Sequence, residues 1–231
     1  MKLEIEPQIF ERIPGLIVIS GIAEVGDANT AGIAEYLKKS WDKLTGEVKQ
    51  TGYKNHPMVL QWREALTEAQ IPINNFPPSI EAIAKRTEKV ADPFSISPIV
   101  DTYNAISMDL ALPFGAYDVN QLQGNLKLRI SAGNENFMPM MGKAEEQTLN
   151  SEIVYSDDTT VLTRQFLWRQ SEKGKILNTT TKIIFVCELL DSMGDETLTR
   201  ATDLIKTKFK ELLNADIQDL VALKGKTHYD K

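Results

Sequence analysis

In the first half of the chain, apolar residues recur every three or four positions, which is the spacing of one face of an α-helix. Asn29-Thr30 is a candidate N-cap for the first of these helices. Its predicted buried face consists of Ile33, Leu37, Trp41, Leu44 and Val48. The same spacing predicts three further helices: one after Asn55, one over residues 80–90, and one that opens at Ser97-Pro98 and ends at Pro113.

From about residue 124 the spacing changes to the alternation of a β-strand. Leu126, Leu128 and Ile130 alternate with charged residues, so three aliphatic side chains would share one face. Helices, then strands, then a final helix indicate an α+β fold with helices packed on a mixed or antiparallel sheet. Further strands are predicted over residues 3–5, 16–19, 137–141, 153–155, 161–168 and 182–188, and the last helix over 195–214.

We expect residues 1–231 to form a single composite domain, because no low-complexity linker interrupts the pattern. It would comprise an N-terminal strand-helix part over 1–79, a central part over 80–190 and the C-terminal helix over 195–214. The polar tail from Lys224 is expected to be loose.

Charge and composition narrow the class of protein. The 231 residues carry 26 basic and 32 acidic side chains, a formal net charge of −6. No apolar run is long enough to span a bilayer, and Glu4 and Glu6 stand where a signal peptide would be apolar. We therefore expect a cytoplasmic protein with no membrane partner. An acidic chain is not a general binder of phosphate backbones, so DNA is not an expected partner and any RNA contact would be local.

The sequence offers little for cofactor chemistry. With one cysteine, Cys187, no intramolecular disulfide can form, and His56 and His228 lie far apart in the chain, which disfavours a zinc site. A Ser-His-Asp or Cys-His pair would have to use one of these two histidines. Glycine-rich phosphate loops are absent, and Asp157-Asp158 is better explained as a solvated hairpin turn than as half a metal site. We expect no cofactor and no metal.

Arg164 is unusual for its position in the strand-rich section. On a continuous strand over 161–168 it would share a face with large apolar residues and with Gln170. It is either a structural arginine tied to a carboxylate such as Asp118, or part of a pocket wall whose polar groups face a ligand. The end of this strand, residues 168–172, suits substrate recognition and an exposed polar turn equally well.

Residues 97–118 resemble a known protein family. The positions that keep step with its pattern are Val100-Asp101, Asn104, Pro113, Ala116 and Asp118. The pattern is that of the B3/B4 domain, the tRNA-binding and editing region of the phenylalanyl-tRNA synthetase beta subunit. The resemblance continues through residues 126–129 and the acidic turn at 155–158, and it covers about residues 80–190. Because the aminoacylation core and the anticodon-binding domain are missing, the chain resembles a free-standing version of this domain.

The resemblance implies a fold like that of the synthetase editing domain and an ester hydrolase that acts on mischarged tRNA. In the synthetase, this domain hydrolyses tyrosine wrongly esterified to the phenylalanine tRNA, because a phenylalanine pocket excludes the extra hydroxyl imperfectly. A positioned water, an oxyanion partner and the terminal ribose hydroxyl could suffice for such hydrolysis without a metal.

Carried over position by position, the family's site falls on two segments. The histidine of its His-Ala-Phe-Asp stretch corresponds to Gly115, which opens the pocket. Its Gly-Gly-Glu-His stretch falls near residues 168–172, where Glu172, or Gln170 after a shift of two, takes the glutamate's place. The resemblance therefore implies Glu172 and Gln170 as catalytic residues, and Asn104, Gly115, Tyr117, Asp118, Arg164 and Trp168 as residues that bind or support the substrate.

Three functions remain open from the sequence. The first is a trans-editing hydrolase of a mischarged aminoacyl-tRNA, and the second is a non-catalytic module that binds a free amino acid, an aminoacyl-adenosine or an RNA end. The third is a small-molecule hydrolase on the same scaffold. A basic collar around the pocket would favour the tRNA 3′ end as partner, whereas scattered solvated charges would not. The candidate collar consists of Lys127, Arg129, Lys143, Arg169, Lys173 and Lys175.

Overall fold

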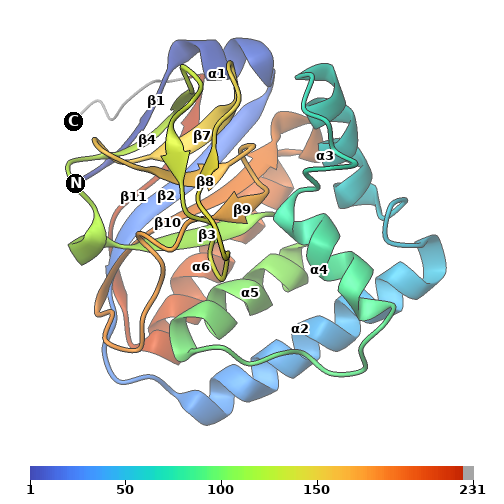
Figure 1. The fold of residues 1–231 in the computed structure, drawn as a ribbon. Helices are drawn as coiled ribbons and strands as arrows, with labels where there is room; N and C mark the ends of the chain where they lie inside the picture. The colour runs from blue at the N-terminus through green and yellow to red at the C-terminus, as the bar shows by residue number, and fades with distance from the viewer. Residues whose placement is uncertain (226–231) are drawn as a thin grey trace.

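Two β-sheets occupy the middle of the structure, a computed structural model that describes residues 1–225 of the chain (Figure 1). The strands are β1 (Leu3–Ile5), β2 (Leu16–Glu24), β3 (Phe114–Asp118), β4 (Leu126–Ile130), β5 (Asn136–Phe137), β6 (Glu146–Gln147), β7 (Ile153–Ser156), β8 (Val161–Arg164), β9 (Arg169–Gln170), β10 (Lys182–Leu190) and β11 (Asp216–Lys224). The helices are α1 (Pro7–Arg12), α2 (Thr30–Thr51), α3 (Pro57–Glu68), α4 (Ser79–Thr87), α5 (Pro98–Leu110) and α6 (Asp195–Leu213).

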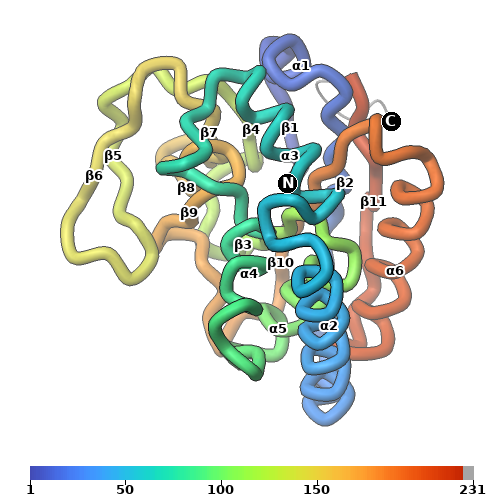
Figure 2. The backbone as a smooth tube through the Cα atoms, turned by 90° about the vertical axis from the view of Figure 1, so that its right-hand side faces the viewer, coloured from blue at the N-terminus to red at the C-terminus, as the bar shows by residue number. Residues whose placement is uncertain are grey.

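The pairing of the strands confirms the predicted α+β class. One sheet has the order β11-β2-β10-β3 and is antiparallel throughout. The other has the order β1-β4-β7-β8-β9, in which β1 runs parallel to β4 and the remaining neighbours are antiparallel. The short strands β5 and β6 form a separate hairpin that projects from the body of the molecule (Figure 2). Helices thus pack on mixed and antiparallel sheets, as expected.

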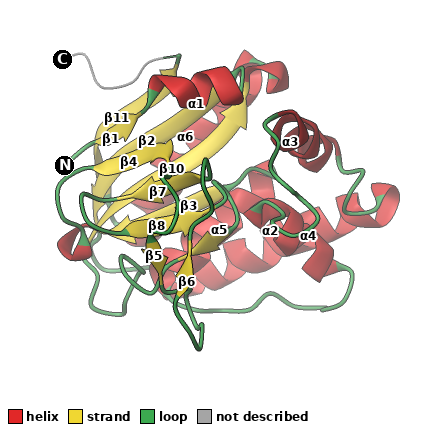
Figure 3. Ribbon diagram, turned by 45° about the horizontal axis from the view of Figure 1, so that its top comes forward, coloured by secondary structure: helices red, strands yellow, loops and turns green. Residues whose placement is uncertain are grey.

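The two inner strands of the first sheet, β2 and β10, are buried on both faces. Helices α5 and α6 cover one face, where Phe185 of β10 packs against Phe114 and Phe209 with ring centroids 5.8 and 5.0 Å apart (Figure 3). The second sheet, together with α1 and α3, covers the opposite face. Because neither face meets water, β2 is a nearly continuous apolar run rather than an alternating one.

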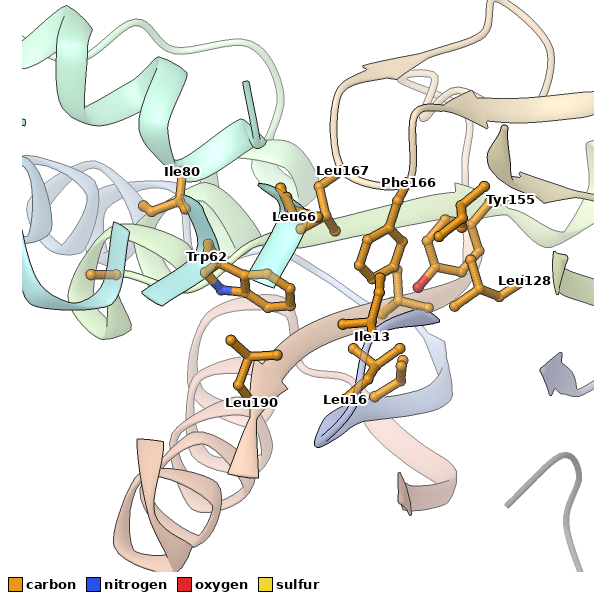
Figure 4. Close-up of a cluster of buried hydrophobic side chains, with 14 of the residues drawn as sticks. Ile13, Leu16, Trp62, Leu66, Ile80, Leu128, Tyr155, Phe166, Leu167 and Leu190 are labelled. Carbon is orange, nitrogen blue, oxygen red and sulfur yellow. The ribbon is translucent and has the colours of Figure 1, made fainter. Parts of the chain in front are cut away.

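A row of aromatic rings fills part of the space on the second face (Figure 4). Trp62 of α3 lies edge-on to Phe166, with ring centroids 6.0 Å apart, and Phe166 stacks on Tyr155 of β7 at 6.1 Å. All three side chains are almost fully buried. Such rings contribute much of the apolar area of a core, so this row holds the helical part against the second sheet.

The helices predicted from the apolar spacing are all present. Helix α2 follows Asn29, whose side-chain oxygen accepts a hydrogen bond of 3.0 Å from the backbone N–H of Gly32. Five elements were not predicted, namely α1, β3, β6, β9 and β11, and β3, β6 and β9 have only two to five residues each. Helix α1 has six residues, too few to show a period, and β11 carries a bulge between Gln218 and Val221 that disturbs its alternation.

Two predicted strands are shorter than expected. Strand β8 ends at Arg164 instead of residue 168, because Gln165 and Phe166 adopt left-handed backbone conformations with φ of 50° and 62°. Strand β5 takes up only the first part of the segment predicted over 137–141. The N-terminal β1 pairs with β4, and β11 pairs with β2, so both ends of the described chain join the central sheets. Most of the tail predicted to be loose from Lys224 lies outside the described residues.

Within residues 1–225, no helix has both the length and the apolar character needed to cross a membrane.

The burial of β10 can be tested through the thiol of Cys187, which is fully buried at its centre. Burial raises the pKa of this thiol well above its ordinary value, and the thiolate is the reactive form. We expect Ellman's reagent at pH 8 to leave the native protein unlabelled and to modify one thiol per chain in urea. Equal labelling rates with and without urea would contradict the buried position of β10, and Cys187→Ser provides the blank.

Candidate functional site

A pocket of about 210 Å³ lies between the two sheets, beside the end of α5 and the start of α4. Five of its half-buried or exposed lining residues form what we call the mouth, and its buried lining residues with hydrogen-bonded polar side chains form what we call the floor. The mouth is formed by Asn104, Gly115, Met140, Trp168 and Gln170. The floor is formed by Tyr117, Tyr155, Thr163 and Glu188. Five of the residues implied by the family resemblance thus line one cavity: Asn104, Gly115, Tyr117, Trp168 and Gln170.

The exit of α5 sets the position of Gly115 and Tyr117. The helix ends at Leu110, and Ala111 takes a left-handed conformation with φ of 53°. The chain then enters β3, where residues two apart share the face turned toward the second sheet. A Cβ atom on Gly115 would meet only Val186 Cγ2, at an ordinary contact distance of 3.8 Å. Glycine here therefore leaves space open at the mouth rather than relieving backbone strain.

The wall opposite β3 is built from a turn of unusual conformation. Gln165 and Phe166 are consecutive non-glycine residues with positive φ, a combination that costs of order 1–3 kcal/mol for each residue. The Phe166 N–H donates a hydrogen bond of 2.7 Å to the carbonyl of Ile153, which anchors the turn on β7. The turn directs Trp168 to the mouth, where its ring packs edge-on against Phe76 at 4.7 Å. Strain of this kind is concentrated at functional sites.

Glu188 on the floor was not predicted as a site residue. It is 2% exposed, and the Tyr155 hydroxyl donates a hydrogen bond of 2.6 Å to its Oε1 atom. Burial raises the pKa of Glu188 to about 7. At neutral pH the carboxyl is therefore divided between a protonated form that can donate a hydrogen bond and an ionised form that only accepts. The available sequence signal was that Glu188 is the one charged residue in the apolar run from Ile183 to Leu190 of strand β10.

A second polar pair lies beside this carboxyl on the floor. The hydroxyl groups of Tyr117 and Thr163 are 2.7 Å apart and share a hydrogen bond between β3 and β8. Burial raises the pKa of both Tyr117 and Tyr155, so their hydroxyls stay protonated. The floor thus offers hydroxyl and carboxyl groups inside a pocket whose remaining walls are largely apolar and aromatic.

Glu172 lies outside this pocket, although the resemblance implied that it acts there. Its carboxylate accepts a hydrogen bond of 2.6 Å from the Met141 N–H and another from Lys175 Nζ. The hydrogen bond from Lys175 is the main reason that the pKa of Glu172 is lowered. In the same region the Met140 N–H donates to the carbonyl of Gln170 at 2.9 Å. Glu172 therefore fixes the loop that carries Met140 beside the mouth, and only Gln170 of the two implied catalytic residues lines the pocket.

Arg164 and Asp118 also lie outside the lining. Arg164 is buried, and its guanidinium binds both carboxylate oxygens of Glu152 at 2.9 and 3.0 Å and Glu146 at 2.8 Å. The structural interpretation of Arg164 is therefore confirmed, but the partner suggested from the sequence, Asp118, is wrong. Asp118 instead accepts hydrogen bonds from the Asn120 N–H and the Thr180 hydroxyl, at 2.9 and 2.7 Å.

The predicted basic collar is largely neutralised. Five of its six cations form ion pairs with nearby acids, and within residues 1–225 the sixth, Lys143, makes no ion pair. The structure thus favours locally paired charges over a collar for RNA phosphates. The pairs are Lys127 with Asp158, Arg129 with Glu135, Arg169 with Glu146, Lys173 with Asp157, and Lys175 with Glu172.

The other candidates for chemistry lie away from the pocket. Asp157 accepts hydrogen bonds from the backbone N–H groups of Thr159 and Thr160, which confirms that this acidic segment is a turn, although Asp157 is buried and only Asp158 is solvated as predicted. His56 Nε2 lies 3.1 Å from Glu47 in the helical layer, and His228 is outside the described residues. Among residues 1–225, no group of His, Cys, Asp and Glu side chains is placed to hold a metal ion.

The state of Glu188 makes the stability of the protein depend on pH. In the unfolded chain a glutamate titrates near 4.3, whereas the native pKa is about 7. Between these values the unfolded state releases a proton that the native state keeps, so the free energy of unfolding falls as pH rises. We expect Glu188→Gln, which cannot ionise, to be more stable than the parent by about 3–4 kcal/mol at pH 8 and by no more than about 0.5 kcal/mol at pH 4.5. Urea titrations at several pH values measure this, with the exposed Glu64→Gln as control; a constant difference at all pH values would contradict it.

The buried ion pair gives a second test. The Glu152 side chain has no exposed surface, so Arg164→Met would leave its carboxylate buried without its main partner. We expect a loss of about 3–5 kcal/mol in the free energy of unfolding, and a clearly smaller loss when Glu152→Gln is added. Urea unfolding followed by circular dichroism measures both variants. A loss below about 1 kcal/mol for the single variant would show that the pair does not hold the turn.

Comparisons with known proteins assign the chain to a family. A solved structure, the N-terminal fragment of the phenylalanyl-tRNA synthetase beta subunit from Pyrococcus horikoshii, is similar to this chain with a TM-score of 0.49 and 8% identity. The similarity covers 96% of this chain and 53% of that one, so the chain spans about half the length of the fragment. A search of curated proteins finds no match. The family model of the B3/4 domain matches residues 61–210, which is more than half of the chain and includes most of the pocket, and the protein therefore belongs to the B3/4 domain family.

Proposed function

We propose that this protein binds the aminoacyl group at the 3′ end of a mischarged tRNA and hydrolyses its ester. The observation that supports the proposal is the polar floor, with the buried carboxyl of Glu188 hydrogen-bonded to Tyr155, in a pocket of about 210 Å³. Membership of the B3/4 family, together with the resemblance to the editing region of a tRNA synthetase, favours an RNA-linked substrate over an unrelated one.

The chemistry of the pocket suits a side chain with an apolar body and a hydrogen-bonding tip. Phe166, Leu167 and Val186 supply apolar contacts along the walls, whereas Glu188 and the Tyr117–Thr163 pair can exchange hydrogen bonds with the tip. A site of this kind rejects ligands that lack the polar group, because its own buried polar groups would then remain without partners. The proposed substrate therefore carries a hydroxyl or similar group on its side chain.

The ester would lie at the mouth, among amide side chains. The Gln170 side-chain N–H donates a hydrogen bond of 3.0 Å to the Ala116 carbonyl. This bond fixes the Gln170 amide, so its side-chain oxygen is available to accept a hydrogen bond from a water or from the substrate amine. Asn104 lies on the same mouth. A water oriented by these groups attacks the ester carbonyl, the acyl C–O bond breaks, and the ribose hydroxyl leaves with a proton. Positioning of the water and the terminal ribose is the main source of rate in such a site.

One observation favours a second function, binding without turnover. Glu172 is held by Met141 and Lys175 outside the pocket, and among the described lining residues Glu188 on the floor is the one carboxylic acid. A general base at the mouth is therefore replaced by neutral amides. In this alternative the same pocket retains a free amino acid or an aminoacyl-adenosine as a bound ligand.

Gly115 allows the pocket to be closed selectively. We expect Gly115→Leu to fill the mouth and lower ester cleavage by about tenfold or more, whereas Gly115→Ala, whose added atom meets only Val186 at 3.8 Å, should keep most of the activity. Release of labelled amino acid from a panel of mischarged tRNAs measures the effect, and thermal denaturation confirms that both variants fold.

The same panel separates the candidate functions. Cleavage of a tRNA ester that Gly115→Leu abolishes supports the proposal. Stabilisation of the protein by an amino acid or aminoacyl-adenosine, without cleavage of any ester, supports the binding module instead. Cleavage of simple amino-acid esters at the same rate as tRNA esters identifies a small-molecule hydrolase, and either of the last two results contradicts tRNA editing.

A further inference from the structure

We propose that a cationic and aromatic surface at the end of α4 contacts the backbone and an unpaired base of the RNA whose 3′ end enters the pocket. This surface, called the α4 patch, consists of Tyr53, Lys54, Lys85, Arg86, Lys89 and Phe94. The inference rests on the proposed function and extends it, since it assigns an RNA contact to a surface outside the pocket.

The cations of the patch are free of acidic partners. Within residues 1–225, Lys54, Lys85, Arg86 and Lys89 are exposed and make no ion pair, whereas five of the six cations of the predicted collar are paired with carboxylates. The exposed acid among them, Glu88, accepts a long hydrogen bond of 3.4 Å from the Tyr53 N–H. Binding to phosphate depends on unpaired cations, because each one that meets a phosphate releases counterions. In an acidic chain, this patch is where such cations gather.

Two aromatic rings lie among these cations. Lys54 Nζ and Lys85 Nζ are each 5.9 Å from the centre of the Tyr53 ring, and the Arg86 guanidinium lies 4.9 Å from that of Phe94. Phe94 is 65% exposed, which is unusual for so large an apolar side chain. Rings that stack on bases beside cations that bind phosphates are the two components of single-strand recognition.

The position of the patch fits a ligand that also reaches the pocket. Helix α4 begins at Ser79, which lines the pocket, and ends at Thr87, immediately before Glu88 and Lys89 (Figure 1). Its nine residues span about 13 Å. Helix α2 packs on α4, and the loop after α2 brings Tyr53 and Lys54 to the same end. An RNA strand that lies along α4 can therefore touch both places at once.

Two other partners, an acidic peptide and an anionic membrane, could also meet these cations. An acidic peptide would meet the cations and leave the rings without a stacking partner. An anionic membrane would meet both kinds of group, and the nearby exposed side chains of Val90 and Ile96 give it an apolar contact as well. RNA is favoured because the patch lies at one end of a helix whose other end lines the pocket proposed for an RNA terminus.

Charge reversal on the patch tests this inference in the full chain. We expect Lys85→Glu/Lys89→Glu to weaken binding to bulk tRNA at least tenfold in filter assays and to reduce the slope of log affinity against log salt by about two. The control is Lys39→Glu/Lys206→Glu, which has the same net charge and changes exposed, unpaired helix residues elsewhere. Phe94→Ala, which removes the stacking ring without altering charge, should weaken binding about fivefold or more. Equal affinities for the patch variant and the control would overturn the proposal.

A short substrate distinguishes the patch from the pocket. Cleavage or binding of an aminoacyl-adenosine should be unchanged in the patch variants, because this ligand cannot reach past α4. If no ester is cleaved but tRNA binding still depends on the patch, the proposed function fails and the RNA contact stands. If esters are cleaved but tRNA binding is the same in the patch variants and the parent, the proposed function stands and the RNA contact fails. If the patch variants lose binding to phosphatidylserine vesicles but keep tRNA binding, the RNA proposal fails and the patch binds a membrane instead.

Discussion

The hydrogen bond between Tyr155 and Glu188 joins the two sheets of this protein on the floor of its pocket. Glu188 comes from β10, an inner strand of one sheet, and Tyr155 from β7, the central strand of the other. A buried carboxyl is unfavourable without a partner, so the two sheets must keep this relative position for the carboxyl to be satisfied. The same carboxyl provides the pocket with a group that can donate or accept a hydrogen bond near neutral pH. Structure and recognition therefore depend on one pair of side chains.

The wall around this floor is maintained by a second buried polar network. Arg164, Glu152 and the left-handed residues Gln165 and Phe166 are adjacent, and the Gln165 N–H donates to Glu152 at 2.9 Å. The carboxylate thus ties a guanidinium and a strained backbone together in one place. Strain of this size persists only where the surroundings over-determine the conformation. This explains why Arg164 is buried among apolar residues although it does not line the pocket.

Charge is distributed unevenly over the molecule. Five of the six cations of the predicted collar are paired with acids, whereas within residues 1–225 the lysines and the arginine of the α4 patch make no ion pair. Paired surface charges contribute little attraction for a phosphate, because their field is already compensated and screened. The net charge of −6 therefore conceals a local surface with the opposite sign.

The sequence by itself determined the class of fold, the helices with a clear apolar period, most strands, and five residues that line the pocket. It could do so because period and turn residues are local properties, and because residues 97–118 carry a family pattern. Only the tertiary structure decided that Glu188 faces the pocket and that Glu172 holds a loop outside the pocket. It also decided that Arg164 pairs with Glu152 rather than with Asp118. Each of these depends on contacts between segments far apart in the chain or on the conformation of an irregular turn. Neither the period of a strand nor the spacing of a motif specifies which distant side chain will meet a buried charge.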